Sequence, residues 1–119
     1  MAIISFALTI EEFLNGKKTV TRRDWSDWQF KRWQGFWHKA QFYSFDYFIH
    51  DAYDRSPRAG GKKIGEFRLT EKPYREKLKD MPIEELKAEG GMCANIEDYC
   101  RLIGKTPEDY VTVIRFVKI

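Results

Sequence analysis

A cluster of basic and hydroxyl side chains near the N-terminus has the residue types needed for acyl transfer or for phosphate binding. The segment Gly16–Arg23 reads Gly-Lys-Lys-Thr-Val-Thr-Arg-Arg and holds four cations within seven residues. An amine beside a hydroxyl can serve as base and nucleophile, and closely spaced cations can neutralise a phosphate. A Walker-type phosphate loop is excluded, because the GxxxxGK[ST] pattern is absent. The alternative is a solvated edge strand whose charges prevent aggregation.

Acid–base chemistry in this cluster depends on the pKa of a lysine. An ordinary lysine has a pKa near 10.4, too high for a base at neutral pH. The neighbouring cations disfavour the protonated form of Lys18, and burial in a cleft would add to their effect. A neutral Lys18 could then take a proton from Thr21 or from a water. On a regular strand these two side chains face opposite sides, so they can meet only if the chain bends or bulges after Gly16.

A second basic segment lies in the middle of the chain, over residues 54–63. Its Ser-Pro and Gly-Gly pairs mark a loop, and it carries four basic residues. Adjacent glycines permit close approach of the backbone to a phosphate, which the cations could neutralise. The alternative is an exposed hairpin loop that is basic by chance. The two segments together give seven candidate phosphate-binding residues: Lys17, Arg22, Arg23, Arg55, Arg58, Lys62 and Lys63.

An aromatic-rich helix is expected over about residues 24–40, which contain all four tryptophans. The aromatic residues cover a wider arc of the helix than the apolar stripe of an ordinary surface helix. Most of such an arc is core, and we expect Trp33 and Trp37 to be the exposed members. Exposed rings would suit base stacking or a protein partner.

The remaining elements follow from capping residues and hydrophobic periodicity. Thr9 and Glu12 predict a capping box for a short helix that Gly16 ends, and Asp24 and Asn95 are candidate caps of two later helices. The helix after Asn95 is expected to end at Gly104, with a buried side made of Ile96, Tyr99, Leu102 and Ile103. Strands are expected over residues 3–8, 18–23, 42–53 (one or two strands), 64–70 and 110–119, and further helices over 82–89 and 96–103. Strands and helices do not alternate cleanly. The pattern therefore predicts an α+β fold, with a small mixed sheet or open barrel and short helices outside.

Length and composition bound the possible functions. The chain has 119 residues and a net charge of +3, which fits one domain over residues 1–119 and permits a nucleic-acid partner without requiring one. No apolar run is long enough to span a membrane and no leader pattern is present, so we expect a cytoplasmic protein with no membrane partner. Cys93 and Cys100 lack metal-ligand spacing, so we expect no metal site, and no cofactor. His50 and Asp51 could form an acid–base pair, but adjacent side chains on a strand point to opposite faces, so we expect no such pair.

The segment Gly16–Arg23 resembles the signature of the ASCH domain, a branch of the PUA-like superfamily. The pattern G-[KR]-K-T-x-T-x-R follows a strand and a short helix, as it does here. Ser5-Phe6 and Glu89-Gly90 resemble further parts of the ASCH pattern. The resemblance implies a PUA-like pseudobarrel with a cleft that faces RNA or a nucleoside.

The resemblance also implies candidate activities. Some ASCH proteins are amidohydrolases that remove the acetyl group of N4-acetylcytidine, and their working lysine and threonine correspond to Lys18 and Thr21. Their glutamate lies upstream of the helix that begins after Asn95, where Glu89 is the nearest candidate. The expected catalytic residues are therefore Lys18, Thr21 and Glu89, and the expected partner is RNA or a modified nucleoside. The alternatives are a non-catalytic RNA-binding module, a ribonuclease, and a partner-binding domain that uses the aromatic helix.

Overall fold

The C-terminal strand β6 (Tyr110–Lys118) organises the sheet of this computed structural model, which describes residues 2–91 and 93–119. It pairs antiparallel with β2 (Val20–Arg23), β4 (Lys63–Leu69) and β5 (Tyr74–Lys77). Residues 111–114 of β6 are buried on both faces of the strand, so β6 packs on both sides while it hydrogen-bonds several neighbours.

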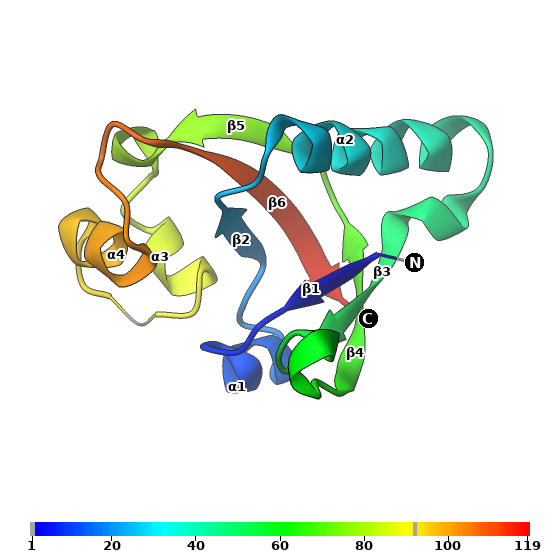
Figure 1. The fold of residues 1–119 in the computed structure, drawn as a ribbon, viewed down its shortest axis with the longest axis horizontal. Coiled ribbons are helices and arrows are strands. Elements are labelled where there is room, and N and C mark those ends of the chain that lie inside the picture. The colour runs from blue at the N-terminus through cyan, green and yellow to red at the C-terminus, as the bar shows by residue number, and fades with distance from the viewer. Residues whose placement is uncertain (1, 92) are drawn as a thin grey trace.

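Two further strands complete the sheet on the far side of β4. The strand β3 (Ile49–Tyr53) runs antiparallel to β4, and β1 (Ile3–Ser5) runs parallel to β3. The strand order is β1-β3-β4-β6-β2, with β5 also on β6. The sheet curls into a half-barrel with a few helices around it (Figure 1), so the predicted α+β class with external helices is confirmed at this level.

The helices lie around the sheet (Figure 1). Their bounds are α1 Ile10–Leu14, α2 Asp27–Phe42, α3 Glu85–Ala88 and α4 Ile96–Ile103, with 3₁₀ turns η1 Phe45–Phe48, η2 Pro57–Ala59 and η3 Leu78–Asp80. The long helix α2 runs along one side, whereas α3 and α4 gather at the other end of the molecule. None of the helices in residues 2–91 and 93–119 is both long and apolar enough to cross a membrane.

Several local signals act as the sequence predicts. The side chain of Asn95 caps α4 by accepting a hydrogen bond from the Asp98 amide at 2.8 Å. Gly16 and Gly104 follow α1 and α4 with φ angles of 78° and 72°, the left-handed conformation that favours glycine at a helix end. The predicted capping box at Thr9 is wrong, because that side chain makes no capping hydrogen bond.

Other boundaries differ from the prediction. Ser26, not Asp24, caps α2, whose first turn therefore begins later, and the helix extends to Phe42. The segment expected to be strand from residue 42 begins instead with the end of α2 and with η1, and only Ile49–Tyr53 is extended. The strand β5 was not expected at all. It is charged and short, and its extended form comes from pairing with β6 rather than from its own composition.

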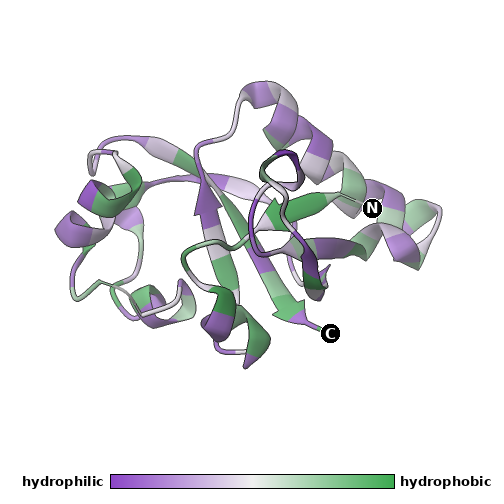
Figure 2. Ribbon diagram, turned by 60° about the horizontal axis from the view of Figure 1, so that its bottom comes forward, coloured by the Kyte–Doolittle hydropathy of each residue, from purple (hydrophilic) through white to green (hydrophobic). Residues whose placement is uncertain are grey.

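Two hydrophobic clusters hold the molecule together, and β6 contributes to both. The larger contains Phe6, Phe13, Trp33, Phe67 and Phe116, and it lies under α1 and α2. The smaller lies under α3 and α4, and includes Leu78, Tyr99 and Val111. Hydrophobic residues recur along the central strands, whereas the outer loops are largely hydrophilic (Figure 2).

The aromatic face of α2 packs on the larger cluster. The prediction that Trp33 is exposed is wrong: it is 1% exposed and its ring lies 4.6 Å from that of His50 and 5.2 Å from that of Trp25. Trp37 is half-buried and contacts Phe48 at 4.9 Å between ring centroids. Trp28 is the exposed tryptophan, at 69%. A helical wheel shows the width of an apolar arc but not which part of it faces the sheet.

Buried His50 makes the stability of the fold pH-dependent. Its Nε2 hydrogen-bonds the carbonyl oxygen of Tyr47 at 2.8 Å, and its Nδ1 accepts from the Ala2 amide at 3.2 Å. Burial lowers the pKa of His50 from 6.5 to about 4. The unfolded chain therefore binds a proton between these values that the folded chain excludes, so the free energy of unfolding should fall by up to about 3 kcal/mol as the pH drops from 6.5 to 4.

Urea unfolding of the wild type and of His50→Gln from pH 7 to 4.5 measures this effect. Glutamine keeps one donor and one acceptor but does not titrate. We expect the variant to lose less stability than the wild type over this range. If the free energy of unfolding fell equally with pH in both proteins, His50 would not be the group responsible.

Candidate functional site

A pocket of about 380 Å³ lies where the two hydrophobic clusters meet. It brings together all three expected catalytic residues, Lys18, Thr21 and Glu89. The other lining residues come from the end of β1 and the loop after it, from β2 and the loop after it, and from α4 and its C-terminal end: Ser5, Phe6, Ala7, Leu8, Thr9, Arg22, Arg23, Asp24, Tyr99, Leu102, Ile103 and Lys105. Its volume is in the range of about 300–1,000 Å³ that small-molecule sites occupy.

Lys18 reaches the pocket because it precedes the strand. The strand β2 begins at Val20, and the Lys18 amide donates instead to the carbonyl oxygen of Glu12 in α1 at 3.0 Å. The alternation that would separate Lys18 from Thr21 on a regular strand therefore does not apply. Gly16, with a φ angle of 78°, ends α1, and residues 17–19 between it and β2 are not part of a strand.

The amine of Lys18 lies in a buried environment that lowers its pKa. The residue is 4% exposed, and its Nζ donates to the carbonyl oxygen of Glu89. Burial lowers its pKa from 10.5 to about 8, the negative charge of Glu89 opposes this, and the charge of Arg23 lowers the pKa further. The main cause is therefore burial, and the neighbouring cations, which the sequence suggested first, contribute less.

Thr21 is hydrogen-bonded by a cation on its own strand. Arg23 Nε donates to Thr21 Oγ1 at 3.0 Å, and Arg23 Nη2 donates to the carbonyl oxygen of Ser5 at 2.6 Å. The two residues share a strand face because side chains alternate along β2. Thr21 has one hydroxyl proton, and as it accepts from Arg23 this proton remains available for donation.

Glu89 is held at both carboxylate oxygens. Tyr99 Oη donates to Oε1 at 2.6 Å and Arg22 Nη1 donates to Oε2 at 3.3 Å. Glu89 directly follows α3 and is 6% exposed. Burial raises the pKa of Tyr99 well above its usual range, and the carboxylate of Glu89 adds to this, so the phenol stays protonated as the donor.

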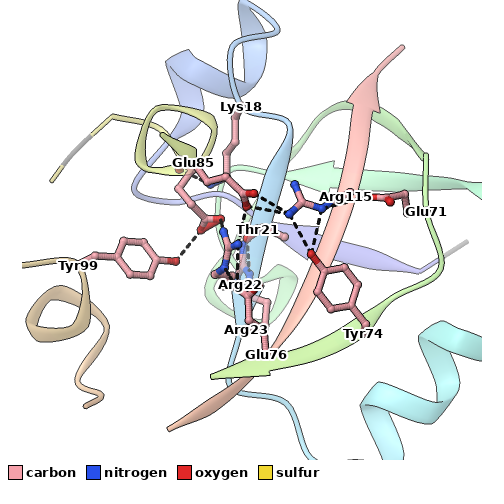
Figure 3. A network of polar contacts seen from close by, with 11 residues as sticks. Lys18, Thr21, Arg22, Arg23, Glu71, Tyr74, Glu76, Glu85, Tyr99 and Arg115 are labelled. Atoms are coloured by element: carbon pink, nitrogen blue, oxygen red, sulfur yellow. Dashed lines mark hydrogen bonds and ion pairs between the residues drawn. The ribbon is translucent and has the colours of Figure 1, made fainter. Parts of the chain in front are cut away.

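Arg22 is the centre of an ion-pair network behind the pocket (Figure 3). Its guanidinium is paired with Glu76 at 3.0 Å, Glu85 at 2.5 Å and Glu89 at 3.3 Å. Burial opposes the charge of Arg22, but the hydrogen bond to Glu85 and the three carboxylates outweigh it and raise its pKa. Arg115 extends the network by pairing with Glu85 at 2.8 Å.

The remaining candidate phosphate-binding residues lie outside the pocket. Lys17 is exposed and lines a second hollow of about 730 Å³ between α1 and α3. The loop residues Arg55, Arg58, Lys62 and Lys63 are exposed around η2, and Lys63 pairs with Asp51 at 3.1 Å and Glu66 at 3.2 Å. Of the seven candidate cations, Arg22 and Arg23 therefore line the pocket, and the other five lie elsewhere on the surface.

Sequence reasoning missed the partners of the site. Tyr99 was expected only as part of the buried face of α4; its phenol signals a polar role, because a buried tyrosine hydroxyl usually finds a hydrogen-bond partner. Glu76 lies on the strand that was not predicted. Lys105 and Asp24 form an ion pair of 2.5 Å, and both line the pocket. Pairs of this kind, distant in the chain, leave no sequence signal.

Within residues 2–91 and 93–119, no three histidine, cysteine, aspartate or glutamate side chains gather as a metal site. Comparisons of the chain with protein-family models, with curated proteins and with solved structures find no match.

Proposed function

We propose that this protein is an amidohydrolase that acts on an acylated nucleoside such as N4-acetylcytidine. One observation carries the proposal. Lys18, Thr21 and Glu89 line one pocket, although Lys18 and Glu89 are 71 residues apart in the chain. A buried amine of lowered pKa, a hydroxyl with a free proton and a fixed carboxylate are the groups that acyl transfer requires. The likeness of residues 16–23 to the ASCH signature supports the same activity.

In the proposed reaction Thr21 is the nucleophile. Neutral Lys18 takes the Thr21 hydroxyl proton as Oγ1 bonds to the acyl carbon and the negative charge moves to the acyl oxygen. The hydrogen bond from Arg23 stabilises the charge that Oγ1 carries as its proton leaves. The carbon–nitrogen bond then breaks, and Lys18 returns the proton to the leaving amine. Water hydrolyses the acyl-threonine ester, with Lys18 again as base, and releases the acid. Glu89 accepts a hydrogen bond from the substrate amine and orients it.

The charges at the pocket favour a nucleoside over a polynucleotide. Each cation that lines it already has a partner among the described residues: Lys18 the Glu89 carbonyl, Arg22 three carboxylates, Arg23 the Ser5 carbonyl, and Lys105 the Asp24 carboxylate. A phosphate would have to displace one of these partners. An uncharged acylated base with its sugar would not.

The pH dependence of wild-type turnover tests the role of Lys18. Only its neutral form accepts a proton, and with a pKa of about 8 roughly a tenth of the molecules have it at pH 7. We expect kcat/KM for N4-acetylcytidine to rise about tenfold from pH 7 to pH 9 and then level off. Release of cytidine, followed by liquid chromatography, is the measurement.

The same preparation should be incubated with single-stranded RNA. Absence of nucleoside turnover at any pH would refute the amidohydrolase. RNA cleavage in its place would indicate a ribonuclease, and salt-sensitive RNA binding without reaction would indicate a binding module.

A further inference from the structure

Lys18 and Glu89 are neighbours that do not form an ion pair. The Lys18 Nζ donates to the backbone carbonyl oxygen of Glu89, and no ion pair among the described residues includes Lys18. Rotation about the side-chain bonds of Glu89 would bring its carboxylate to the amine, since the amine already touches the backbone of the same residue. Something must therefore hold the carboxylate in its observed position.

Two donors hold the Glu89 carboxylate in its observed position. Tyr99 on α4 donates to Oε1 at 2.6 Å, and Arg22 on β2 donates to Oε2 at 3.3 Å. Arg22 cannot follow the carboxylate if it moves, because Glu76 and Glu85 bind its other nitrogens at 3.0–3.2 Å and 2.5 Å. Its side chain has no exposed surface. The clamp is therefore anchored in the network behind the pocket.

We propose that Tyr99 and Arg22 are positioning residues that hold the Glu89 carboxylate away from the Lys18 amine, so that no ion pair forms and the amine remains available as a base. The catalytic part of this inference rests on the proposed amidohydrolase activity. The observed positions of the two donors, the carboxylate and the amine do not depend on that activity.

The electrostatics of Lys18 agree with this role. The charged groups around its amine are Glu89, Arg23, Glu12 and Arg22, from the end of α3, from β2 and from α1. The two carboxylates raise its pKa and the two guanidiniums lower it, whereas burial has the largest effect and lowers it to about 8. A carboxylate in direct contact would raise a lysine pKa by about one to three units. An ion pair with Glu89 would therefore remove most of the shift that burial provides.

Tyr99→Phe tests the clamp, because it removes one donor and keeps the ring in the smaller hydrophobic cluster. Tyr74→Phe is the matched control. It removes a hydroxyl that accepts from Arg115 at 2.9 Å in the same network but does not touch Glu89. The first readout is the titration of the Lys18 side chain by carbon-13 NMR, assigned by comparison with Lys18→Met. It needs no substrate.

We expect Tyr99→Phe to raise the Lys18 midpoint by about one pH unit and Tyr74→Phe to change it by less than about 0.3. Arg22→Lys keeps the positive charge but loses the planar fork, and should raise the midpoint in the same direction. The pH at which kcat/KM reaches half of its maximum should rise by the same amount. For Tyr99→Phe, kcat/KM at pH 7 should therefore be about tenfold lower than in the wild type.

Three outcomes separate the clamp from the proposed activity. A Lys18 midpoint in Tyr99→Phe equal to that of the wild type, in a variant that is folded by circular dichroism, overturns the clamp. A lower melting temperature with no shift of the midpoint does the same, since it shows a structural role alone. A wild type without turnover but with a shifted midpoint in Tyr99→Phe supports the clamp and refutes the proposed activity.

Discussion

Replacement of Lys18 by methionine should reduce kcat for N4-acetylcytidine roughly 1,000-fold. General-base groups contribute about 10²–10⁴ to rate, and no other neutral amine lines the described pocket. Methionine keeps the length and the apolar stem of the side chain, so the packing beside Phe6, whose ring centroid lies 6.0 Å from the amine, is retained. KM should change little, because the lost group acts on the proton rather than on the body of the substrate.

The same substitution leaves the Glu89 carbonyl oxygen without its donor. A buried acceptor without a partner costs about 1–3 kcal/mol of stability, so urea unfolding must accompany the kinetics. Lys87→Met is the control, since Lys87 is an exposed lysine of α3 that does not line the pocket. Turnover in that variant should stay within twofold of the wild type. Comparable activity in Lys18→Met and the wild type would refute the role of Lys18.

Replacement of Trp33 by alanine should lower the free energy of unfolding by about 3–5 kcal/mol. Large-to-small changes of fully buried aromatics lose the transfer free energy of the ring and leave a cavity. Trp33 is 1% exposed and lies against Trp25, Phe36 and His50, so the space cannot be filled without moving α2. The midpoint of urea unfolding, with an unchanged slope, is the measurement.

Trp28→Ala is the matched control on the same helix. Its ring is 69% exposed and has one cation–π contact, with the Arg32 guanidinium 5.7 Å from the ring centroid. Its loss should cost less than about 1 kcal/mol. Equal costs at the two positions would contradict the packing of α2, in which Trp33 is buried and Trp28 is exposed, the reverse of what the sequence led us to expect.

The sequence predicted the elements whose signals are local. Asn95 and Gly104 bound α4, Gly16 ends α1, and the alternation of β6 marks a long strand. The helix ends are set by hydrogen bonds or φ preferences within a few residues, and the strand by the period of its side chains. The strand β5 had no such signal, and its extended form depends on pairing with β6.

The candidate site was likewise predictable from the sequence only in part. The cluster of residues 16–23 was visible in the sequence, and with it Lys18 and Thr21 as candidate catalytic residues. The sequence did not show that Lys18 precedes the strand, because the start of β2 at Val20 is set by where β6 offers hydrogen bonds. Burial of Lys18, which lowers its pKa more than the neighbouring charges do, is likewise a property of the packed molecule.

The amino-acid sequence by itself thus determined which side chains are available for chemistry and where the chain turns near them. The tertiary structure alone decided their partners. It brought Glu89 to Lys18 across 71 residues, placed Tyr99 and Arg22 on its two carboxylate oxygens, and left the basic loop at residues 54–63 outside the pocket. The physical reason is that capping and turn preferences act over a few residues, whereas burial and ion pairing depend on which distant segments the sheet brings together.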